Sequence, residues 1–102
     1  MTEYEHEESA VAEAEEKVEQ PPLYKVLLHN DDYTTMEFVV YVLESVFSMP
    51  EEQAVQVMLN VHLRGIGVAG IYPFEIAEMK VGKATALARE QEFPLLVTME
   101  EA

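Results

Sequence analysis

The chain of 102 residues contains no cysteine, and only six lysine and arginine residues stand against 20 aspartate and glutamate residues. Without cysteine there is no disulfide framework, no thiolate nucleophile and no thiolate-ligated metal site. A formal net charge of −14 leaves no basic patch for a phosphate backbone or an anionic membrane surface. We therefore expect no nucleic-acid partner and no membrane partner, and a cytoplasmic location.

Long apolar runs, targeting signals and common catalytic motifs are also missing. The best candidate for a membrane span is interrupted by Glu37 and Glu44, and it falls short of the ~18–20 apolar residues that a span requires. The N-terminus is rich in acid and has no apolar core, unlike a signal or transit peptide. No Gly-x-Ser-x-Gly motif and no phosphate-binding glycine-rich loop is present. The sequence therefore argues against an enzyme.

Charge divides the chain into two parts. Residues 1–20 carry eight glutamates against one lysine. High like charge with low hydrophobicity predicts a flexible acidic extension over residues 1–21. Consecutive prolines at 21 and 22 favour extended chain and mark the boundary of a compact domain over residues 22–102.

The compact part alternates strand and helix signals. Thr34-x-x-Glu37 and Ser48-x-x-Glu51 both have capping-box spacing and predict helix starts, and Gly65 suits a left-handed helix end. Pro73 is acceptable at the start of another helix. The expected elements are strands over 24–30, 68–72 and 95–99 and helices over 34–47, 50–64 and 73–93.

The element order is therefore β-α-α-β-α-β. Three strands are not stable alone in water, so helices must cover one face of the sheet. We expect an α+β, two-layer sandwich in which a three-stranded antiparallel sheet is covered on one face by three helices.

Polar side chains follow the first expected strand directly. Along an extended chain, Leu28, Asn30 and Asp32 point to one side, whereas His29 and Asp31 point to the other. Asn30 and Asp32 can thus converge on one ligand, with Asp31 less constrained because the strand is ending. The alternative is that these residues merely cap the next helix.

Apolar side chains recur at helical spacing in the two helices that follow. Met36 and Val39 share a face of the first, and Met58 and Val61 share a face of the second, next to His62. Apolar residues at this spacing belong to a core more often than to a ligand site, so the pattern alone leaves both interpretations open. Combined with the polar cluster, it suits a ligand that is cationic at one end and apolar beside it. An unblocked protein N-terminus with a bulky first side chain fits this description.

Four potential metal ligands form the weakest candidate site. His29, Asp31, Asp32 and His62 lie in no His-Glu-x-x-His motif and in no EF-hand loop, and strand alternation directs His29 away from Asp32. We expect no metal site and no cofactor, and a metal-dependent hydrolase remains a distant alternative.

One continuous run at 24–39 reads Tyr-Lys-Val-Leu-Leu-His-Asn-Asp-Asp-Tyr-Thr-Thr-Met-Glu-Phe-Val, and Met-x-x-Val-His follows downstream. These motifs closely resemble the ClpS family, adaptors that deliver substrates with an N-terminal degradation signal (N-degron) to the Clp ATPase–protease. Further similarity at 54–62, 70–80 and 94–100 extends the resemblance over about residues 22–102.

The resemblance implies a non-enzymatic adaptor for proteins that begin with Leu, Phe, Tyr or Trp. Polar residues would hold the free α-amino group, and an apolar pocket would take the first side chain. The implied residues are Asn30, Asp31, Asp32 and His62 for the amine, and Thr34, Met36, Val39, Met58, Val61 and Leu95 for the pocket.

The resemblance also implies a second partner, the N-terminal domain of the Clp AAA+ ATPase. The residues that match the family's docking patch are Glu75 and Lys80, which could equally belong to an ordinary solvated helix face. The ATPase would engage the acidic extension during handover, and we expect a monomer.

One departure from the family is Thr35, where proline is common. Thr35 leaves the helix entrance freer or takes over its capping. The competing hypothesis is a structural interaction module similar to the C-terminal domain of the ribosomal stalk protein. The partner surfaces of that domain tend to be rich in lysine, which this acidic chain is not.

Overall fold

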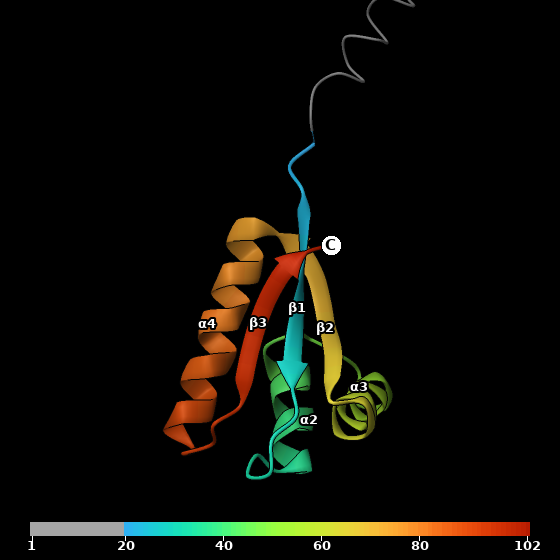
Figure 1. Cartoon of the computed structure of the whole chain (residues 1–102), viewed down its shortest axis with the longest axis vertical. Helices are drawn as coiled ribbons and strands as arrows, with labels where there is room; N and C mark the ends of the chain where they lie inside the picture. Colours follow the sequence, from blue (N-terminus) through green and yellow to red (C-terminus); the bar gives the residue numbers. More distant parts are fainter. Residues whose placement is uncertain (1–19) are drawn as a thin grey trace, which may run out of the picture.

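The computed structural model describes residues 20–102, which form three strands and three helices (Figure 1). The predicted acidic extension lies outside the described residues except for residues 20 and 21. Within residues 20–102, none of the helices combines the length and the apolar composition that a membrane span needs. The elements are β1 (Leu23–His29), α2 (Met36–Ser45), α3 (Glu51–Arg64), β2 (Ile66–Pro73), α4 (Phe74–Glu90) and β3 (Leu96–Glu101).

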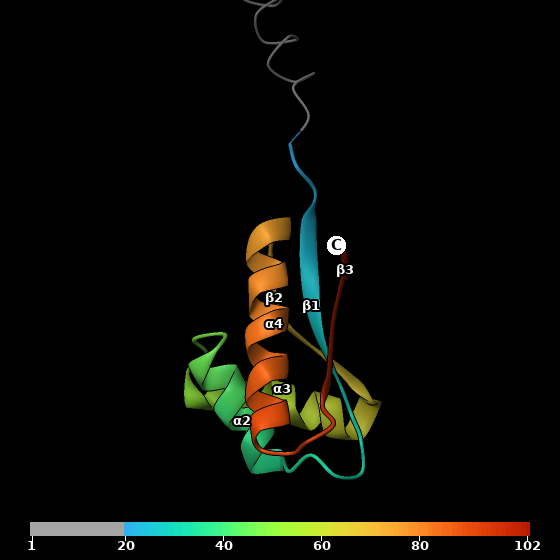
Figure 2. The same cartoon turned by 90° about the vertical axis from the view of Figure 1, so that its left-hand side faces the viewer.

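The three strands form one antiparallel sheet in the order β2-β1-β3. Central β1 places Leu28 opposite Gly67 of β2 and Val97 of β3. Figures 1 and 2 together show α2 and α4 behind the sheet, whereas α3 runs beside the lower end of β2; the rest of the other face is open to the viewer of Figure 1. The predicted α+β architecture and its β-α-α-β-α-β order are confirmed.

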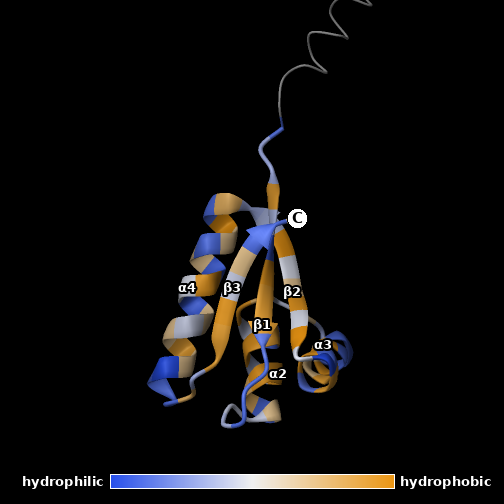
Figure 3. Cartoon of the chain, viewed as in Figure 1, coloured by the Kyte–Doolittle hydropathy of each residue, from blue (hydrophilic) through white to orange (hydrophobic). Residues whose placement is uncertain are grey.

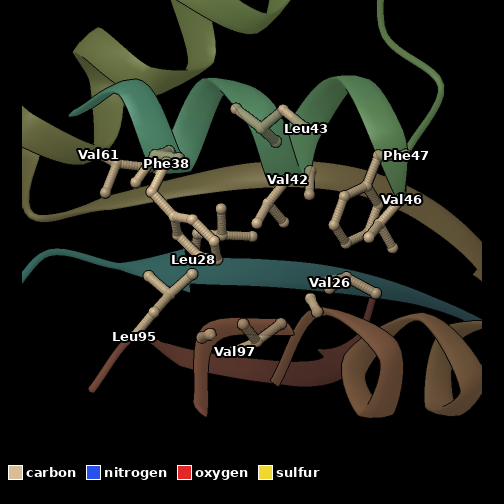
Figure 4. Close-up of a cluster of buried hydrophobic side chains, with 14 of the residues drawn as sticks. Val26, Leu28, Phe38, Val42, Leu43, Val46, Phe47, Val61, Leu95 and Val97 are labelled. Atoms are coloured by element: carbon tan, nitrogen blue, oxygen red, sulfur yellow. The ribbon is translucent and has the colours of Figure 1, made fainter. Parts of the chain in front are cut away.

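The core lies between the sheet and the helices. Val26 and Leu28 on β1 are fully buried, and Val42 and Leu43 on α2 are fully buried above them. Figure 4 shows Val42 projecting from α2 toward β1, with Phe38 beside Leu28, whereas Leu43 lies level with the α2 ribbon. Burying each such side chain contributes ~1.5–3 kcal/mol, so this interface fixes α2 over β1.

Helix α2 begins one residue later than the capping box predicted. Its N-cap is Thr35, whose hydroxyl accepts a hydrogen bond from the Phe38 amide at 3.1 Å, whereas Thr34 binds Asp31. The prediction that Thr34 caps the helix is therefore wrong, and Thr35 has taken over the capping. The helix ends at Ser45, two residues before the expected end.

Helix α3 also starts without the predicted side-chain cap. Ser48 has φ 53°, in the left-handed region, and Pro50 is the N-cap. At the other end Gly65 has φ 88° and its N–H donates to the carbonyl of Val61, as the sequence predicted. This helix end turns the chain directly into β2.

The remaining boundaries differ from expectation by one to three residues. Strand β2 is longer than predicted at its start, because pairing with His29 begins already at Ile66. Pro73 was predicted to be the first residue of the last helix, but it is the N-cap of α4 and the last residue of β2. Strand β3 runs on to Glu101, which pairs with Tyr24. The extra pairing places β1 as a fully paired central strand that leads straight to the polar cluster.

Candidate functional site

A cavity of about 340 Å³ lies where β1 ends, between the start of α2 and the second half of α3. This volume is at the small end of the range of about 300–1,000 Å³ found for ligand sites. It suits one bulky side chain with its attached polar group. The lining residues are Asn30, Asp31, Asp32, Tyr33, Thr34, Thr35, Met36, Val39, Met58, Val61 and His62.

Apolar side chains from two helices line the depth of the cavity. Val39 of α2 and Val61 of α3 are buried, with 5% and 2% of their surface exposed. Met58, one turn before Val61, is half-buried, and Met36 is 46% exposed. Methionine is unbranched and flexible, so these two residues can adapt to different apolar groups.

A glycine in the sheet sets the position of α3 above it. A Cβ atom at Gly67 would lie 2.7 Å from Cγ2 of Val61 and 3.2 Å from the carbonyl oxygen of Val57. Only glycine therefore allows α3 to approach β2 this closely. Because Val61 forms part of the cavity wall, Gly67 shapes the cavity without lining it.

The mouth of the cavity is polar. Asn30 and Asp32, from the loop after β1, and His62, from α3, all line it and are exposed. The backbone N–H of Asn30 donates a hydrogen bond to the carbonyl of Gly65 at 2.9 Å, which holds the end of β1 next to the end of α3. This bond explains how residues 32 positions apart reach the same cavity.

Asp31 is occupied within its own loop. Its Oδ1 accepts hydrogen bonds from the amides of Tyr33 and Thr34 at 2.8 and 2.7 Å, and its Oδ2 accepts one from the Thr34 hydroxyl at 2.7 Å. These three bonds fold residues 31–34 into a tight turn. Asp31 therefore acts on the site by holding the loop that carries its neighbours.

The same bonds determine the ionisation of Asp31. Burial is the largest single influence and acts to raise the pKa of this carboxyl. The hydrogen bonds from Thr34 and Tyr33 and the charge of Arg89 outweigh it, so the pKa lies below the usual 3.8. The loop is thus held by a carboxylate that stays ionised at neutral pH.

Leu95 is the one predicted pocket residue that the structure places elsewhere. It is 1% exposed and belongs to the core, near Leu28 and Val97 (Figure 4). It lies just before β3, at the far edge of the sheet from α3, so its side chain does not reach the cavity lining. His29 faces away from the cavity, as strand alternation predicted, and is hydrogen-bonded to Thr98 at 2.8 Å.

The two residues predicted to dock the ATPase lie on α4, away from the cavity. Glu75 is exposed in its first turn, whereas Lys80 is half-buried. The Lys80 ammonium donates to the carbonyl of Val46 at 2.7 Å and lies over the rings of Phe47 and Tyr72, at 5.8 and 5.3 Å from their centroids. Lys80 is therefore part of the packing between α4 and the end of α2.

Tyr33 and Thr35 also line the cavity, although the sequence did not nominate them. Tyr33 is 77% exposed at the mouth. Its place in the run Asn-Asp-Asp-Tyr-Thr, between nominated neighbours, was the available signal for it. Thr35 was treated only as a departure from the family at the helix entrance.

The geometry favours binding over catalysis. Within residues 20–102, no group of three His, Cys, Asp or Glu side chains could hold a metal ion. Carboxylate, amide and imidazole groups at the mouth can accept hydrogen bonds from a cation, and the floor below them is apolar. The cavity thus suits a molecule with a positive group directly beside an apolar one.

Comparison with known proteins identifies the relatives of this chain. The family model of the ATP-dependent Clp protease adaptor protein ClpS matches residues 19–98. The ATP-dependent Clp protease adapter protein ClpS of Methylococcus capsulatus is 58% identical to this chain, over 91% of this chain and 88% of the relative. The protein of the same name from Myxococcus xanthus is 52% identical, over 95% of this chain and 92% of the relative. The structure of Agrobacterium tumefaciens ClpS2 bound to L-phenylalaninamide superposes with a TM-score of 0.79 at 46% identity, covering 81% of this chain and all of that one. Proteins of this kind are adaptors and not enzymes, and this chain belongs to the ClpS family of ATP-dependent Clp protease adaptor proteins.

Proposed function

We propose that this protein recognises substrates by a free N-terminal α-amino group and a bulky apolar first side chain. Asn30, Asp32 and His62 accept hydrogen bonds from the ammonium group, and Asp31 supports Asn30 and Asp32 by holding the loop that carries them. The first side chain enters the cavity between α2 and α3, with Thr34 at its rim and Met36, Val39, Met58 and Val61 along its walls. Leu95 has no direct part in this proposal, because it lies in the core.

Known energies make such a site sufficient for recognition. An ammonium group offers three donors, and each charge-assisted hydrogen bond contributes ~1.5–3 kcal/mol. Burying a Leu or Phe side chain adds ~1.5–3 kcal/mol. Part of this gain is lost in ordering a flexible peptide, so we expect a dissociation constant near micromolar, or ~−8 kcal/mol.

The single observation that supports the proposal most directly is the join between the polar mouth and the apolar cavity. L-Phenylalaninamide, the ligand of the Agrobacterium tumefaciens relative, carries an α-amino group and a benzyl side chain on one carbon. A ligand of this shape matches the order of groups in the cavity here. Met36, half exposed at the entrance, would admit Leu, Phe, Tyr and Trp and turn away the β-branched Val and Ile.

The second half of the proposal is delivery to the N-terminal domain of the Clp AAA+ ATPase by a monomer in the cytoplasm. The docking patch would lie on α4 and include the exposed Glu75. Lys80 would reach the partner only from a half-buried position, so we assign it the smaller share of the docking. The interaction-module alternative predicts neither an amine site nor an ATPase partner.

Fluorescence anisotropy with labelled peptides tests the proposal. The peptides differ only at their first residue: free Phe, free Leu, free Ala, free Arg and acetylated Phe. We expect binding of free Phe and free Leu alone, because Ala leaves the cavity empty and acetylation removes the charge. A cationic Arg side chain would be left unpaired among Met and Val.

Two variants locate the site. Asn30→Ala and His62→Ala should each weaken binding of the Phe peptide at least about tenfold, since each removes one acceptor of a charge-assisted bond. Glu75→Gln, which lies on α4, is the matched control and should leave peptide binding unchanged while weakening the ATPase complex. Equal binding of acetylated Phe would rule out the amine site and leave ATPase docking to be judged separately.

A further inference from the structure

In the described part of the chain, the cavity has no lysine or arginine among the residues that line it. Two of its eleven lining residues, Asp31 and Asp32, are aspartates. Both belong to the hydrophilic stretch that Figure 3 shows between the end of β1 and the start of α2. Burial acts to raise the pKa of Asp31, but hydrogen bonds from Thr34 and Tyr33 and the charge of Arg89 hold it below the usual 3.8. A ligand therefore meets an ionised carboxylate at the mouth.

Two arginines come near the cavity without lining it. Arg89 acts on Asp31 through its charge, but its Nη1 donates to the carbonyl of Phe93 at 2.7 Å and to the carbonyl of Leu95 at 3.1 Å. These two bonds hold the guanidinium at the connection between α4 and β3. Arg64 ends α3 and is exposed. Neither arginine is among the lining residues, so neither provides the cavity with a counter-ion for a bound anion.

Backbone N–H groups also bind anions in proteins, and three of those beside the cavity are already bonded. Asp31 accepts the amides of Tyr33 and Thr34. At the start of α2, the Phe38 amide donates to the side chain of the N-cap. Glu37 adds a negative charge to the first turn of α2, where a helix N-terminus otherwise favours an anion. The surroundings of the cavity therefore favour a cation and disfavour an anion.

This charge distribution separates two molecules that share an ammonium group and a side chain. The first residue of a protein has its carboxyl group in a neutral peptide bond, whereas the free amino acid has a carboxylate on the same carbon as the ammonium. Binding that ammonium at Asp32 brings the two carboxylates close together. At a separation of ~6 Å and an effective dielectric constant of about 40, between a protein surface and water, their repulsion weakens binding about tenfold. L-Phenylalaninamide, the ligand of the Agrobacterium tumefaciens relative, has a neutral amide in place of the carboxylate.

We propose that the cavity rejects α-carboxylates, so that it accepts an apolar amino acid only when the carboxyl group is neutral, as in the first residue of a protein. Asp32 determines this selectivity, because it binds the ammonium and repels a carboxylate on the same carbon; Asp31 adds to the repulsion. The inference rests on the proposed recognition of a free N-terminus and extends it to the group on the other side of the α-carbon. Free leucine, phenylalanine and tyrosine therefore compete poorly with protein substrates, whereas small apolar amines without a carboxylate can occupy the cavity.

The test is competition for the labelled free-Phe peptide on the full-length chain at neutral pH. Four competitors share a benzyl group and differ beside the amine: L-phenylalaninamide, L-phenylalanine methyl ester, phenethylamine and L-phenylalanine. We expect the first three to displace the peptide and phenylalanine to be at least about tenfold weaker than its amide. The ester lacks the amide N–H, so its binding separates the effect of charge from that of an extra donor. The amide and the ester are weaker bases than the free amino acid, so incomplete protonation would reduce the expected difference and not create it.

Two variants and a salt series locate the selectivity. Asp32→Asn keeps the shape of the side chain and removes its charge. It should weaken phenylalaninamide about tenfold and phenylalanine much less, so the ratio of the two affinities should fall several-fold. Glu78→Gln removes the same charge from an exposed position on α4, outside the cavity lining, and should leave the ratio unchanged. The wild-type ratio should also fall between about 0.05 M and about 0.5 M NaCl, because salt screens repulsion between exposed charges. A purely structural role of Asp32 would not give this salt dependence.

Three results would overturn the inference and leave the proposed function intact. The first is competition by phenylalanine as strong as that by its amide. The second is a ratio of affinities that is the same in Asp32→Asn and at both salt concentrations. The third is a methyl ester as weak as phenylalanine, which would assign the selectivity to the amide N–H and not to charge. Failure of the labelled free-Phe peptide itself to bind would instead overturn the proposed function, and this inference with it.

Discussion

Lys80 and Val46 join α4 to the end of α2, because the Lys80 ammonium donates to the Val46 carbonyl at 2.7 Å. Val46 is the C-cap of α2, so its carbonyl lies where a helix leaves acceptors unpaired and where a cation is favoured. The same ammonium also lies over the aromatic rings of Phe47 and Tyr72. A residue that resemblance assigns to docking thus has a structural role of its own.

Removing this ammonium should lower stability. Lys80→Met keeps the apolar stem but loses the hydrogen bond and the two ring contacts, for which we expect a loss of about 1–2 kcal/mol in the free energy of unfolding. Urea unfolding measures it. Lys83→Met is the matched control on the exposed side of α4 and should stay within about 0.5 kcal/mol of wild type. Equal stability of both variants would mean that Lys80 is free for docking alone.

Asp31 should make stability depend on pH. Its pKa is lowered in the folded state, so it stabilises the fold above the unfolded value of 3.8, and this contribution is lost as the pH falls through the lower folded value. Asp31→Asn should cost ~0.5–1 kcal/mol at pH 7, a modest figure because the loop is partly exposed.

The check on Asp31 is a pair of urea unfolding curves at pH 7 and at pH 2.5. The difference between wild type and Asp31→Asn should shrink at the lower pH, which lies below the unfolded value of 3.8. The variant should also bind a free-Phe peptide more weakly at pH 7, because the turn that carries Asn30 and Asp32 is loosened. A pH-independent difference would show that the charge of Asp31 has no part in holding the loop.

Gly67 links packing to binding in a way that can be measured. Gly67→Ala introduces a Cβ 2.7 Å from Cγ2 of Val61, which must displace α3 and the cavity wall. We expect a loss of about 1–3 kcal/mol in stability and several-fold weaker binding of a free-Phe peptide. In contrast, Gly82→Ala meets open space in the middle of α4 and should stabilise the protein by about 0.5–1 kcal/mol without changing binding. Unchanged peptide affinity in Gly67→Ala would show that Gly67 does not determine the shape of the cavity.

Sequence signals predicted the parts of this protein that depend on local chemistry. The left-handed end of α3 follows from Gly65, because only glycine adopts φ 88° without strain. The opposite directions of Asn30 and His29 follow from strand alternation, since a one-residue shift reverses every side chain. The nine predicted lining residues that meet at the cavity come from segments whose type was predicted correctly.

The parts that were missed depend on contacts between distant residues or on competition between neighbours. Thr34 and Thr35 are equally suited by residue type to cap the helix. The Thr34 hydroxyl donates to Asp31, so Thr35 is the residue that caps α2. Leu95 is adjacent to β3 in sequence, but its burial is set by the helices packed over the sheet. Neither the partner of Lys80 nor the close approach at Gly67 is encoded by spacing along the chain.

Thr35 allows the cap of α2 to be tested against the proline that is common in the family. Thr35→Ala should cost about 1 kcal/mol, because the Phe38 amide loses its acceptor at 3.1 Å. Thr35→Pro loses the same bond, but φ is already −73° at this position and suits a proline ring. Fixing this angle reduces the freedom of the unfolded chain and returns about 0.4–1 kcal/mol.

Thr35→Pro should therefore lie close to wild type in urea unfolding, and Thr35→Ala clearly below it. Because Thr35 also lines the cavity beside Met36, the same two variants report on recognition. A stiffer helix entrance restricts Met36. The ratio of the affinities for Leu and Phe peptides to those for Ile and Val peptides should therefore be larger in Thr35→Pro than in wild type. If Thr35→Pro were instead as unstable as Thr35→Ala, the side-chain cap would dominate, and this chain would depend on its threonine where other members of the family use a rigid ring.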